Sequence, residues 1–383
     1  MADEYGSATA VSTATNFIME QETATTRTYR TYVRLRETGQ LDLKFWHSNA
    51  VDSTWDVGNT AKGSMPGGVW VIESACVAVS GHKRDGSIIP GSAIKVTFDG
   101  EVSKEVTPAE KFWSDSVHID VPAGHDLVFS WTITASAGRS FPYNTEGLLV
   151  SAFEAEGNKA GEEQGVLFTA SENRLVLPAF IGYKKQVREE IVFLGDSITQ
   201  GVRTRKDGYE YWVSRIADGL GPEYGIWNIG SGWARAYDAA TDGPWLAKSK
   251  QGSIVAIVLG VNDIDIGSRS ADELLADLSI IIRKIKQNPE RRGVRVILFT
   301  VPPFNFTQER EGVWRTVNET IRTCPPEGTD VVFDIAKVLS CPAPEEHRIQ
   351  PKFMSNEYDP HPNGIAGREV ADAFLEWFRE QNL

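Results

Sequence analysis

The hydrophobic pattern of the chain changes near residue 190. Before that point, short stretches such as 29–35 and 127–133 alternate apolar and polar residues. Alternation gives a strand one apolar and one polar face, which is typical of antiparallel sheets with a single buried side. Turn sequences such as Asp85-Gly86 and Asp99-Gly100 separate these stretches, and helical periodicity is almost absent. The pattern therefore predicts a β-sandwich of jelly-roll type. The small polar residues 1–22 are expected to be a loose leader or an edge strand.

After residue 190 the pattern changes to short unbroken apolar runs separated by helical segments. The runs expected to form strands are 191–194, 225–229, 254–259, 294–301 and 331–335. Unbroken runs of this length are typical of parallel strands that are buried on both faces. Between the runs, apolar residues recur at helical spacing, and Ser270 with Glu273 matches a capping box. This alternation favours a five-stranded parallel sheet between two layers of helices.

The length of 383 residues exceeds one ordinary hydrophobic core and suggests two domains. The change of pattern and the polar stretch 184–190 place the boundary between them. We predict an all-β domain over residues 1–186 and an α/β/α domain over residues 187–383.

Composition and charge narrow the partners that the chain is expected to have. A net charge of −13 argues against nucleic acid and against anionic membrane surfaces. Cys76, Cys324 and Cys341 are too few for a disulfide framework, although a bridge between Cys324 and Cys341 stays open. The sequence shows neither a signal-peptide pattern nor an apolar run of about 20 residues. A cytoplasmic location is expected, or secretion if a leader has been removed.

Three polar residues stand where α/β enzymes place their ligands. Ser197 follows the first buried run, Asn262 follows the run 254–259, and His361 precedes the last helical segment. Each could be an ordinary turn or helix-entry residue when considered alone. Together they supply a nucleophile, a general base and an amide donor, which are the groups that acyl transfer requires.

The sequence blocks around these residues resemble those of the SGNH (GDSL-type) esterases. The blocks, which occur in the order of that family, are Gly195-Asp196-Ser197-Ile198, Asn228-Ile229-Gly230-Ser231-Gly232, Gly260-Val261-Asn262-Asp263 and His361-Pro362-Asn363. The resemblance extends from residue 188 to the end of the sequence. The first half is similar to a β-rich module that some members carry. The resemblance implies a flavodoxin-like fold for the second half and serine esterase activity.

The resemblance also implies roles for individual residues. Ser197 is the expected nucleophile, with His361 as its general base. The expected oxyanion donors are the Ser197 N–H, the Asn262 side-chain amide and one backbone N–H, assigned to Gly232 with Trp233 as the alternative.

The chain departs from the family at the orienting acid, which usually lies three residues before the histidine. Tyr358 occupies that position, and Asp359 lies two residues before His361. We predict that Asp359 orients the imidazole. The alternative is a Ser–His dyad in which a backbone carbonyl takes that role. Asp196 is expected to have a structural role in its turn.

The leading functional hypothesis is hydrolysis of short acyl esters, above all acetyl esters on carbohydrate, through an acyl-enzyme. The alternatives are a lipase, phospholipase or thioesterase on the same site, and a carbohydrate-binding protein without activity. No cofactor and no metal are expected, although Asp263 and Asp265 could mimic a metal cluster. The expected partner is an acylated small molecule or carbohydrate, and the oligomeric state is left open. Trp233, Tyr237 and Trp245 could line the site or pack beneath its loop.

Overall fold

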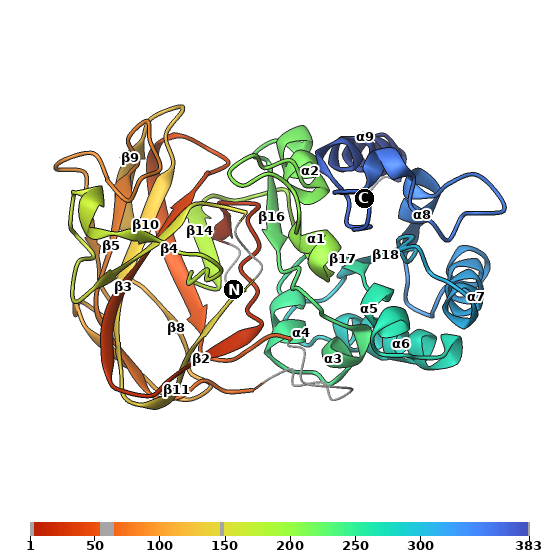
Figure 1. Ribbon diagram of the computed structural model, residues 1–383, viewed down its shortest axis with the longest axis horizontal. Coiled ribbons are helices and arrows are strands. Elements are labelled where there is room, and N and C mark those ends of the chain that lie inside the picture. The colour runs from red at the N-terminus through yellow and green to blue at the C-terminus, as the bar shows by residue number, and fades with distance from the viewer. Residues whose placement is uncertain (1–3, 54–64, 146–148, 382–383) are drawn as a thin grey trace. The chain divides into compact units, whose positions relative to one another are not determined.

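A computed structural model describes residues 4–53, 65–145 and 149–381. The chain forms two compact units, which are treated separately below (Figure 1). The first unit contains Met1–Val51 and Met65–Val187, and the second contains Asp52–Ser64 and Arg188–Leu383. The division therefore falls beside the predicted boundary after residue 186. The sequence pattern did not indicate that Asp52 and Ser53 group with the second unit.

The first unit consists of antiparallel strands. A seven-stranded sheet has the order β13-β12-β3-β10-β5-β6 with β7 also paired to β5, and a five-stranded sheet has the order β1-β14-β4-β8 with β9 also paired to β4. Strands β11 and β2 form a separate pair. The strand bounds are β1 Tyr5–Ser7, β2 Phe17–Gln21, β3 Thr25–Val33, β4 Gly39–Ser48, β5 Trp70–Val79, β6 Ile94–Val96, β7 Lys104–Val106, β8 Lys111–Trp113, β9 Val117–Val121, β10 Leu127–Ala135, β11 Gly138–Tyr143, β12 Ala152–Glu156, β13 Thr169–Ala170 and β14 Phe180–Lys184.

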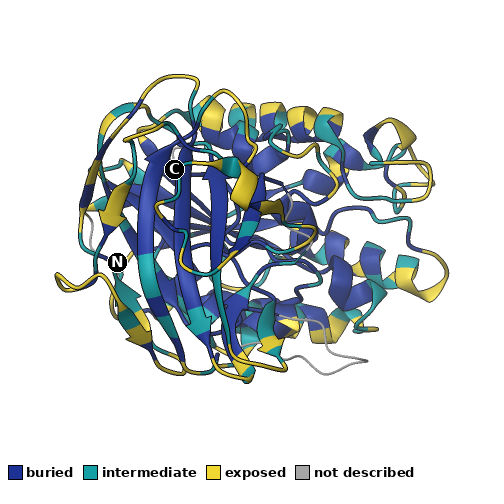
Figure 2. Cartoon of the chain, turned by 60° about the vertical axis from the view of Figure 1, so that its left-hand side comes forward, coloured by how far each residue is buried: buried dark blue, intermediate teal, exposed yellow. Residues whose placement is uncertain are grey.

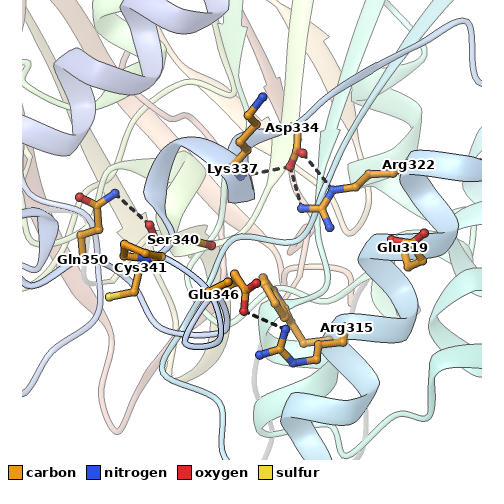
Figure 3. A pocket seen from close by; sticks show the side chains of 12 residues that line it. Arg315, Glu319, Arg322, Asp334, Lys337, Ser340, Cys341, Glu346 and Gln350 are labelled. Atoms are coloured by element: carbon orange, nitrogen blue, oxygen red, sulfur yellow. Dashed lines mark hydrogen bonds and ion pairs between the residues drawn. The ribbon is translucent and has the colours of Figure 1, made fainter.

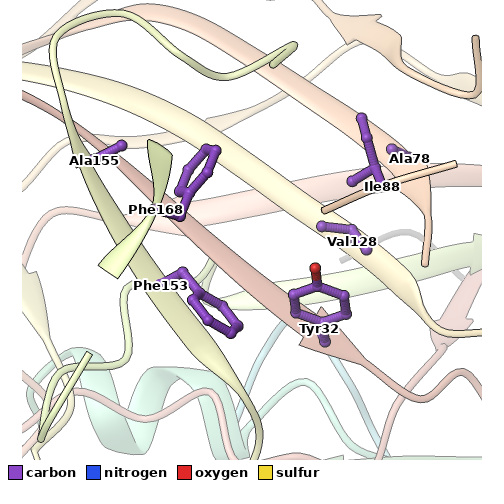
Figure 4. Close-up of a cluster of buried hydrophobic side chains, with 7 residues drawn as sticks. All are labelled: Tyr32, Ala78, Ile88, Val128, Phe153, Ala155 and Phe168. Carbon is purple, nitrogen blue, oxygen red and sulfur yellow. The ribbon is translucent and has the colours of Figure 1, made fainter. Parts of the chain in front are cut away.

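Aromatic contacts between the two large sheets form part of the core of the first unit. The rings of Phe45 in β4 and Phe129 in β10 lie 4.8 Å apart, and those of His47 and Trp131 lie 5.2 Å apart. The central strands of the seven-stranded sheet are almost wholly buried (Figure 2). A further buried cluster on that sheet consists of Tyr32, Ala78, Ile88, Val128, Phe153, Ala155 and Phe168 (Figure 4). The sheet-rich first half is confirmed, and its jelly-roll topology stays a prediction.

The beginning of the chain is more ordered than the expected loose leader. Strand β1 lies at the edge of the five-stranded sheet, as the alternative prediction had it. Residues 8–15 are buried without regular structure. The hydroxyls of Thr9, Thr13 and Thr15 donate to carbonyl groups elsewhere in the first unit. For example, the Thr13 hydroxyl donates to the Ala179 carbonyl across 2.6 Å. The small side chains at these positions fit a packed segment as well as a loose one, so composition alone could not choose between the two alternatives.

The second unit contains the predicted five-stranded parallel sheet, with the order β16-β15-β17-β18-β19. Its strands are β15 Glu189–Gly195, β16 Tyr224–Asn228, β17 Ile254–Val258, β18 Arg295–Phe299 and β19 Val331–Phe333. Strand β15 lies between β16 and β17, so the strand order reverses there. Ligands of open α/β sheets bind at such a reversal, beyond the carboxyl ends of the strands.

Helices cover both faces of this sheet (Figure 1). They are α1 Ser197–Gln200, α2 Trp212–Leu220, α3 Ala236–Ala240, α4 Pro244–Ser249, α5 Val261–Asp265, α6 Ala271–Lys286, α7 Glu309–Thr323, α8 Ile335–Leu339 and α9 Gly364–Glu380. On one face, Trp212 of α2 packs on Phe193 and Phe374 of α9 stacks on Phe299. On the other, α6 contacts α3, α4 and α7. Helix α6 begins at the predicted capping box, in which Ser270 and Glu273 bond reciprocally.

All three cysteines are free thiols, so the bridge between Cys324 and Cys341 is not formed. Within residues 4–53, 65–145 and 149–381, no helix is both long and apolar enough to cross a membrane.

Candidate active site

Ser197 stands at the sharp turn from β15 into α1. Asp196 caps the helix, because its carboxylate accepts a hydrogen bond from the Ile198 N–H at 2.9 Å. A side chain at Gly195 would place its Cβ 2.0 Å from the Thr199 hydroxyl oxygen, so the turn requires glycine there. The predicted structural role of Asp196 is confirmed, and the turn presents Ser197 at the carboxyl end of the sheet.

A continuous chain of hydrogen bonds joins Ser197, His361 and Asp359. The Ser197 Oγ lies 2.9 Å from His361 Nε2, and His361 Nδ1 lies 2.6 Å from Asp359 Oδ1. An ionised carboxylate only accepts hydrogen bonds, so Nδ1 must carry the proton of a neutral imidazole. Nε2 is then the acceptor that faces the serine hydroxyl, which is the tautomer that a general base requires.

The carboxylate of Asp359 has two further donors. Its Oδ1 also accepts from the His361 backbone N–H at 3.1 Å, and its Oδ2 accepts from Arg203 Nε at 3.0 Å. Burial by itself would raise the pKa of Asp359, but the hydrogen bonds from His361 and Arg203 outweigh burial and lower this pKa. Asp359 is therefore an anion at neutral pH.

The loop that carries His361 is fixed by its own hydrogen bonds and by one aromatic contact. The His361 carbonyl accepts from the Ser355 N–H at 2.8 Å. Two residues later, Asn363 caps α9 by accepting from the N–H groups of Ile365 and Ala366. The Phe304 ring meets the imidazole edge to face, with 5.2 Å between the ring centroids. These contacts hold the imidazole in place beside the serine.

The expected oxyanion donors come from three segments, namely α1, α5 and the loop after β16. Asn262 in α5 is buried, and its Nδ2 donates one hydrogen to the Ala234 carbonyl at 3.1 Å, which leaves its second N–H for a ligand. The Ser231 N–H donates to the Gly195 carbonyl at 2.9 Å, so the loop containing Gly232 runs beside the Ser197 turn. Within the described residues, neither the Ser197 nor the Gly232 backbone N–H has a hydrogen-bond acceptor.

Asn228 and Gly230 bring the second loop close to α1. The Asn228 amide donates to the Thr199 carbonyl at 3.1 Å, and its oxygen accepts from the Gly230 N–H at 2.9 Å. A Cβ at Gly230 would lie 2.3 Å from the Gln200 nitrogen, so glycine permits the close approach. In the same loop Trp233 has a φ of +60°, a conformation that is unusual for a residue other than glycine.

Asp263 and Asp265 both have protein partners. Asp263 accepts from the N–H groups of Ala236 and Tyr237 at 2.9 and 3.2 Å, and so caps α3. Asp265 pairs with Arg310 at 2.7 Å. Burial raises the pKa of Asp263 to about 7, against the opposing effect of its two N–H donors. Burial, together with the nearby Asp263, also raises the pKa of Asp196 to about 7.

The aromatic residues near the second loop differ in their surroundings. Trp245 is buried and donates its indole N–H to the Ile229 carbonyl at 2.8 Å, so it packs beneath the loop. The Tyr237 ring is partly exposed, and the guanidinium of Arg269 lies over it at 4.9 Å. Trp245 therefore has a structural role, and of this pair Tyr237 is the one that solvent or a ligand can reach.

A cavity of ≈ 760 Å³ lies elsewhere in the second unit, beside α7 and α8 (Figure 3). Four of its charged side chains form two pairs, Arg315 with Glu346 at 3.0 Å and Arg322 with Asp334 at 2.9 Å. None of the predicted site residues lines it. The cavity is therefore separate from the hydrogen-bond chain at Ser197.

The sequence reasoning missed Arg203 and Phe304. Phe304 follows β18 at the same edge of the sheet as Ser197 and Asn262, so the position of that strand could have indicated it. Arg203 lies in a loop beyond α1, and no sequence signal links it to Asp359.

Comparison with known proteins supports the resemblance. Residues 193–364 match the model of the GDSL-like Lipase/Acylhydrolase family. The chain contains a GDSL-like acylhydrolase domain. The matched domain is that of a carboxylic ester hydrolase. No curated protein matches the chain in sequence.

Several solved structures are similar to this chain. A family 3 carbohydrate esterase from Talaromyces cellulolyticus shares 18% identity, with 50% of this chain and 96% of that chain covered and a TM-score of 0.38. The aryl esterase of M. smegmatis shares 15% identity, with 50% and 99% covered and a TM-score of 0.38. A family two carbohydrate esterase from Cellvibrio japonicus shares 11% identity, with 99% and 96% covered and a TM-score of 0.39.

Proposed function

We propose that the chain is a serine esterase that removes short acyl groups, above all acetyl, from carbohydrate through an acyl-enzyme on Ser197. The observation that carries this proposal is the unbroken hydrogen-bond chain from Ser197 through His361 to Asp359. A serine hydroxyl is a weak nucleophile until an adjacent base takes its proton. The neutral imidazole, with its Nε2 lone pair facing the hydroxyl, is such a base.

The first half-reaction forms the acyl-enzyme. Ser197 Oγ attacks the ester carbonyl as its proton passes to His361 Nε2, and the imidazolium is stabilised by the anionic Asp359 at Nδ1. The carbonyl oxygen becomes an oxyanion, which accepts hydrogen bonds from the N–H groups of Ser197, Gly232 and Asn262. When the tetrahedral intermediate collapses, the C–O bond to the alcohol breaks and Nε2 returns the proton to the leaving oxygen.

The second half-reaction uses water in place of the alcohol. His361 Nε2 takes a proton from the water, whose oxygen attacks the acyl carbon on Ser197. Collapse of the second intermediate breaks the bond to Oγ, and the proton on Nε2 passes back to Oγ. The same donors stabilise both intermediates, and each step is balanced by the residues present and water.

The choice of a short acyl group on carbohydrate is supported by two sequence features. The second half carries no long apolar segment that could form a lid over a lipid chain. The first half, whose proposed fold is a jelly-roll-like accessory sandwich, is similar to the β-rich module of some SGNH esterases. Both features support a short acyl group on carbohydrate as the substrate class, by analogy with the family.

The decisive experiment compares esters of increasing acyl length and then measures acetate release from acetylated oligosaccharides. We expect the highest kcat/KM with the acetyl ester and none with Ser197→Ala. A matched control is Ser279→Ala, because Ser279 lies in α6 and its hydroxyl donates to the Leu275 carbonyl of the same helix. A serine-directed phosphonate should label Ser197 alone. A rate that rises with chain length would instead indicate a lipase, and labelling elsewhere would remove Ser197 from the mechanism.

A further inference from the structure

Arg203 links the nucleophile segment to the acid–base loop. Its Nε donates to Asp359 Oδ2 at 3.0 Å, and the two residues are 156 positions apart in the sequence. The other oxygen of the same carboxylate accepts from His361 Nδ1. We propose that Arg203 is a positioning residue that fixes the carboxylate of Asp359 for its contact with His361. This inference rests on the proposed esterase function.

The short spacing between Asp359 and His361 explains why such a residue is needed. Only Pro360 separates them, so the carboxylate folds back on its own loop and its Oδ1 accepts both from His361 Nδ1 and from the His361 backbone N–H. Both of these donors use the same oxygen, and they leave Oδ2 without a partner from the loop. Arg203 supplies the donor for Oδ2, so that hydrogen bonds restrain both oxygens of the carboxylate.

The turn after α1 holds Arg203 in place relative to Ser197. The N–H groups of Gly201 and Val202 both donate to the Ser197 carbonyl at 3.0 Å, and the Thr204 hydroxyl donates to the Gly201 carbonyl at 2.8 Å. Between them Arg203 adopts a φ of +71°, a region that side chains other than glycine seldom occupy. A single tightly bonded segment therefore carries both the nucleophile and the donor that reaches Asp359.

If the ion pair between Arg203 and Asp359 were purely structural, removing Arg203 should have a different effect on activity. The Arg203 side chain is about half exposed, and exposed ion pairs contribute little to stability. Arg205, two residues later, provides a matched control because it pairs with Glu210 at 2.9 Å and is more exposed. If Arg203 were only a surface ion pair, its removal should have as little effect as the removal of Arg205.

The test measures kcat and KM of the 383-residue chain with p-nitrophenyl acetate. Arg203→Ala should lower kcat by between about 5-fold and about 100-fold, since a small misplacement of a catalytic group has effects of this order. KM should change by less than about 2-fold, and Arg205→Ala should resemble the wild type in both constants. Arg203→Lys should recover only part of the loss, because an ammonium lacks the planar Nε donor.

A double-mutant cycle with Asp359→Asn shows whether Arg203 acts through Asp359. Once the carboxylate is gone, adding Arg203→Ala should change kcat by less than about 2-fold. The proposal is overturned if Arg203→Ala behaves like Arg205→Ala, or if its loss persists undiminished beside Asp359→Asn. If Arg203→Ala does not fold, as judged by thermal unfolding, Arg203→Gln and Arg203→Lys replace it in the cycle. Activity retained by Ser197→Ala would refute the proposed function itself, whatever Arg203 does.

Discussion

Replacement of Asp359 by asparagine tests whether the site is a triad or a dyad. The carboxylate accepts three hydrogen bonds, two at Oδ1 from His361 and one at Oδ2 from Arg203. Asparagine has one accepting oxygen and one donating NH₂, so it cannot satisfy both sides. If its NH₂ faces Arg203, two donors oppose each other. If its NH₂ faces His361, it donates to Nδ1 and forces the proton onto Nε2.

The expected loss in kcat can be worked out for each of these two orientations of the asparagine amide. With the oxygen toward His361, the loss is the attraction between imidazolium and carboxylate, which is about 4 kcal/mol for unit charges about 4 Å apart at an effective dielectric constant of about 20. That corresponds to about 10³-fold in kcat. With the NH₂ toward His361, Nε2 can no longer accept the Ser197 proton, and a loss of about 10⁴-fold is expected. The predicted loss in kcat is therefore about 10³- to 10⁴-fold.

The assay is steady-state hydrolysis of p-nitrophenyl acetate, with thermal unfolding measured on the same samples. Asp242→Asn is the matched control, because Asp242 is an exposed carboxylate that pairs with Lys250 at 2.6 Å and lies outside the site. It should leave kcat unchanged. If Asp359→Asn retains kcat within a few-fold of the wild type while His361→Ala is inactive, the reasoning is wrong and the site functions as a dyad.

Three further predictions concern other parts of the second unit. Asn262→Ala should lower kcat by about 10²- to 10³-fold with little change in KM, as the loss of an oxyanion donor does; near-normal kcat would exclude Asn262 from the site. Lys248 and Asp52 form a fully buried ion pair at 2.6 Å. Lys248→Met leaves the Asp52 charge buried without the Lys248 cation, so it should reduce the free energy of unfolding in urea by about 3–5 kcal/mol. Adding Asp52→Asn should recover part of this lost stability. Burial raises the pKa of Asp263 to about 7, above the pKa of an aspartate in the unfolded chain. Ionisation of Asp263 therefore favours the unfolded state, and the free energy of unfolding falls as the pH rises from about 4 to about 7. Asp263→Asn should therefore gain stability relative to the wild type over that range, by at most about 1.4 kcal/mol per pH unit, and a constant difference in urea midpoints would contradict this.

Much of the second unit could be predicted from local sequence. Strand β17, with every residue buried, coincides with the apolar run 254–259 to within one residue. The capping box at Ser270 marks the start of α6 because its two hydrogen bonds form between residues three positions apart. Positions at strand ends pointed to Ser197 and Asn262 for a related reason, since parallel strands direct their carboxyl ends to one edge of a sheet.

The first unit was harder to predict in detail. Its alternating pattern indicated antiparallel strands but not which strands would pair, because pairing joins residues far apart, as between β3 and β10. The sequence likewise did not indicate that Asp52 would group with the second unit, where it meets Lys248 196 positions later.

The sequence by itself determined the second unit's class of fold and the identities of Ser197, Asn262 and His361 as site candidates, because these depend on local periodicity and on blocks of adjacent residues. Tertiary structure decided which groups the Asp359 carboxylate contacts. The sequence showed an acid one residue closer to His361 than in the resembling family, and whether its carboxylate could face the imidazole depends on the direction of that side chain. Arg203 donates to Asp359 Oδ2, the oxygen that has no donor from the short loop. The two residues meet only in the folded chain, so no local sequence pattern encodes this contact.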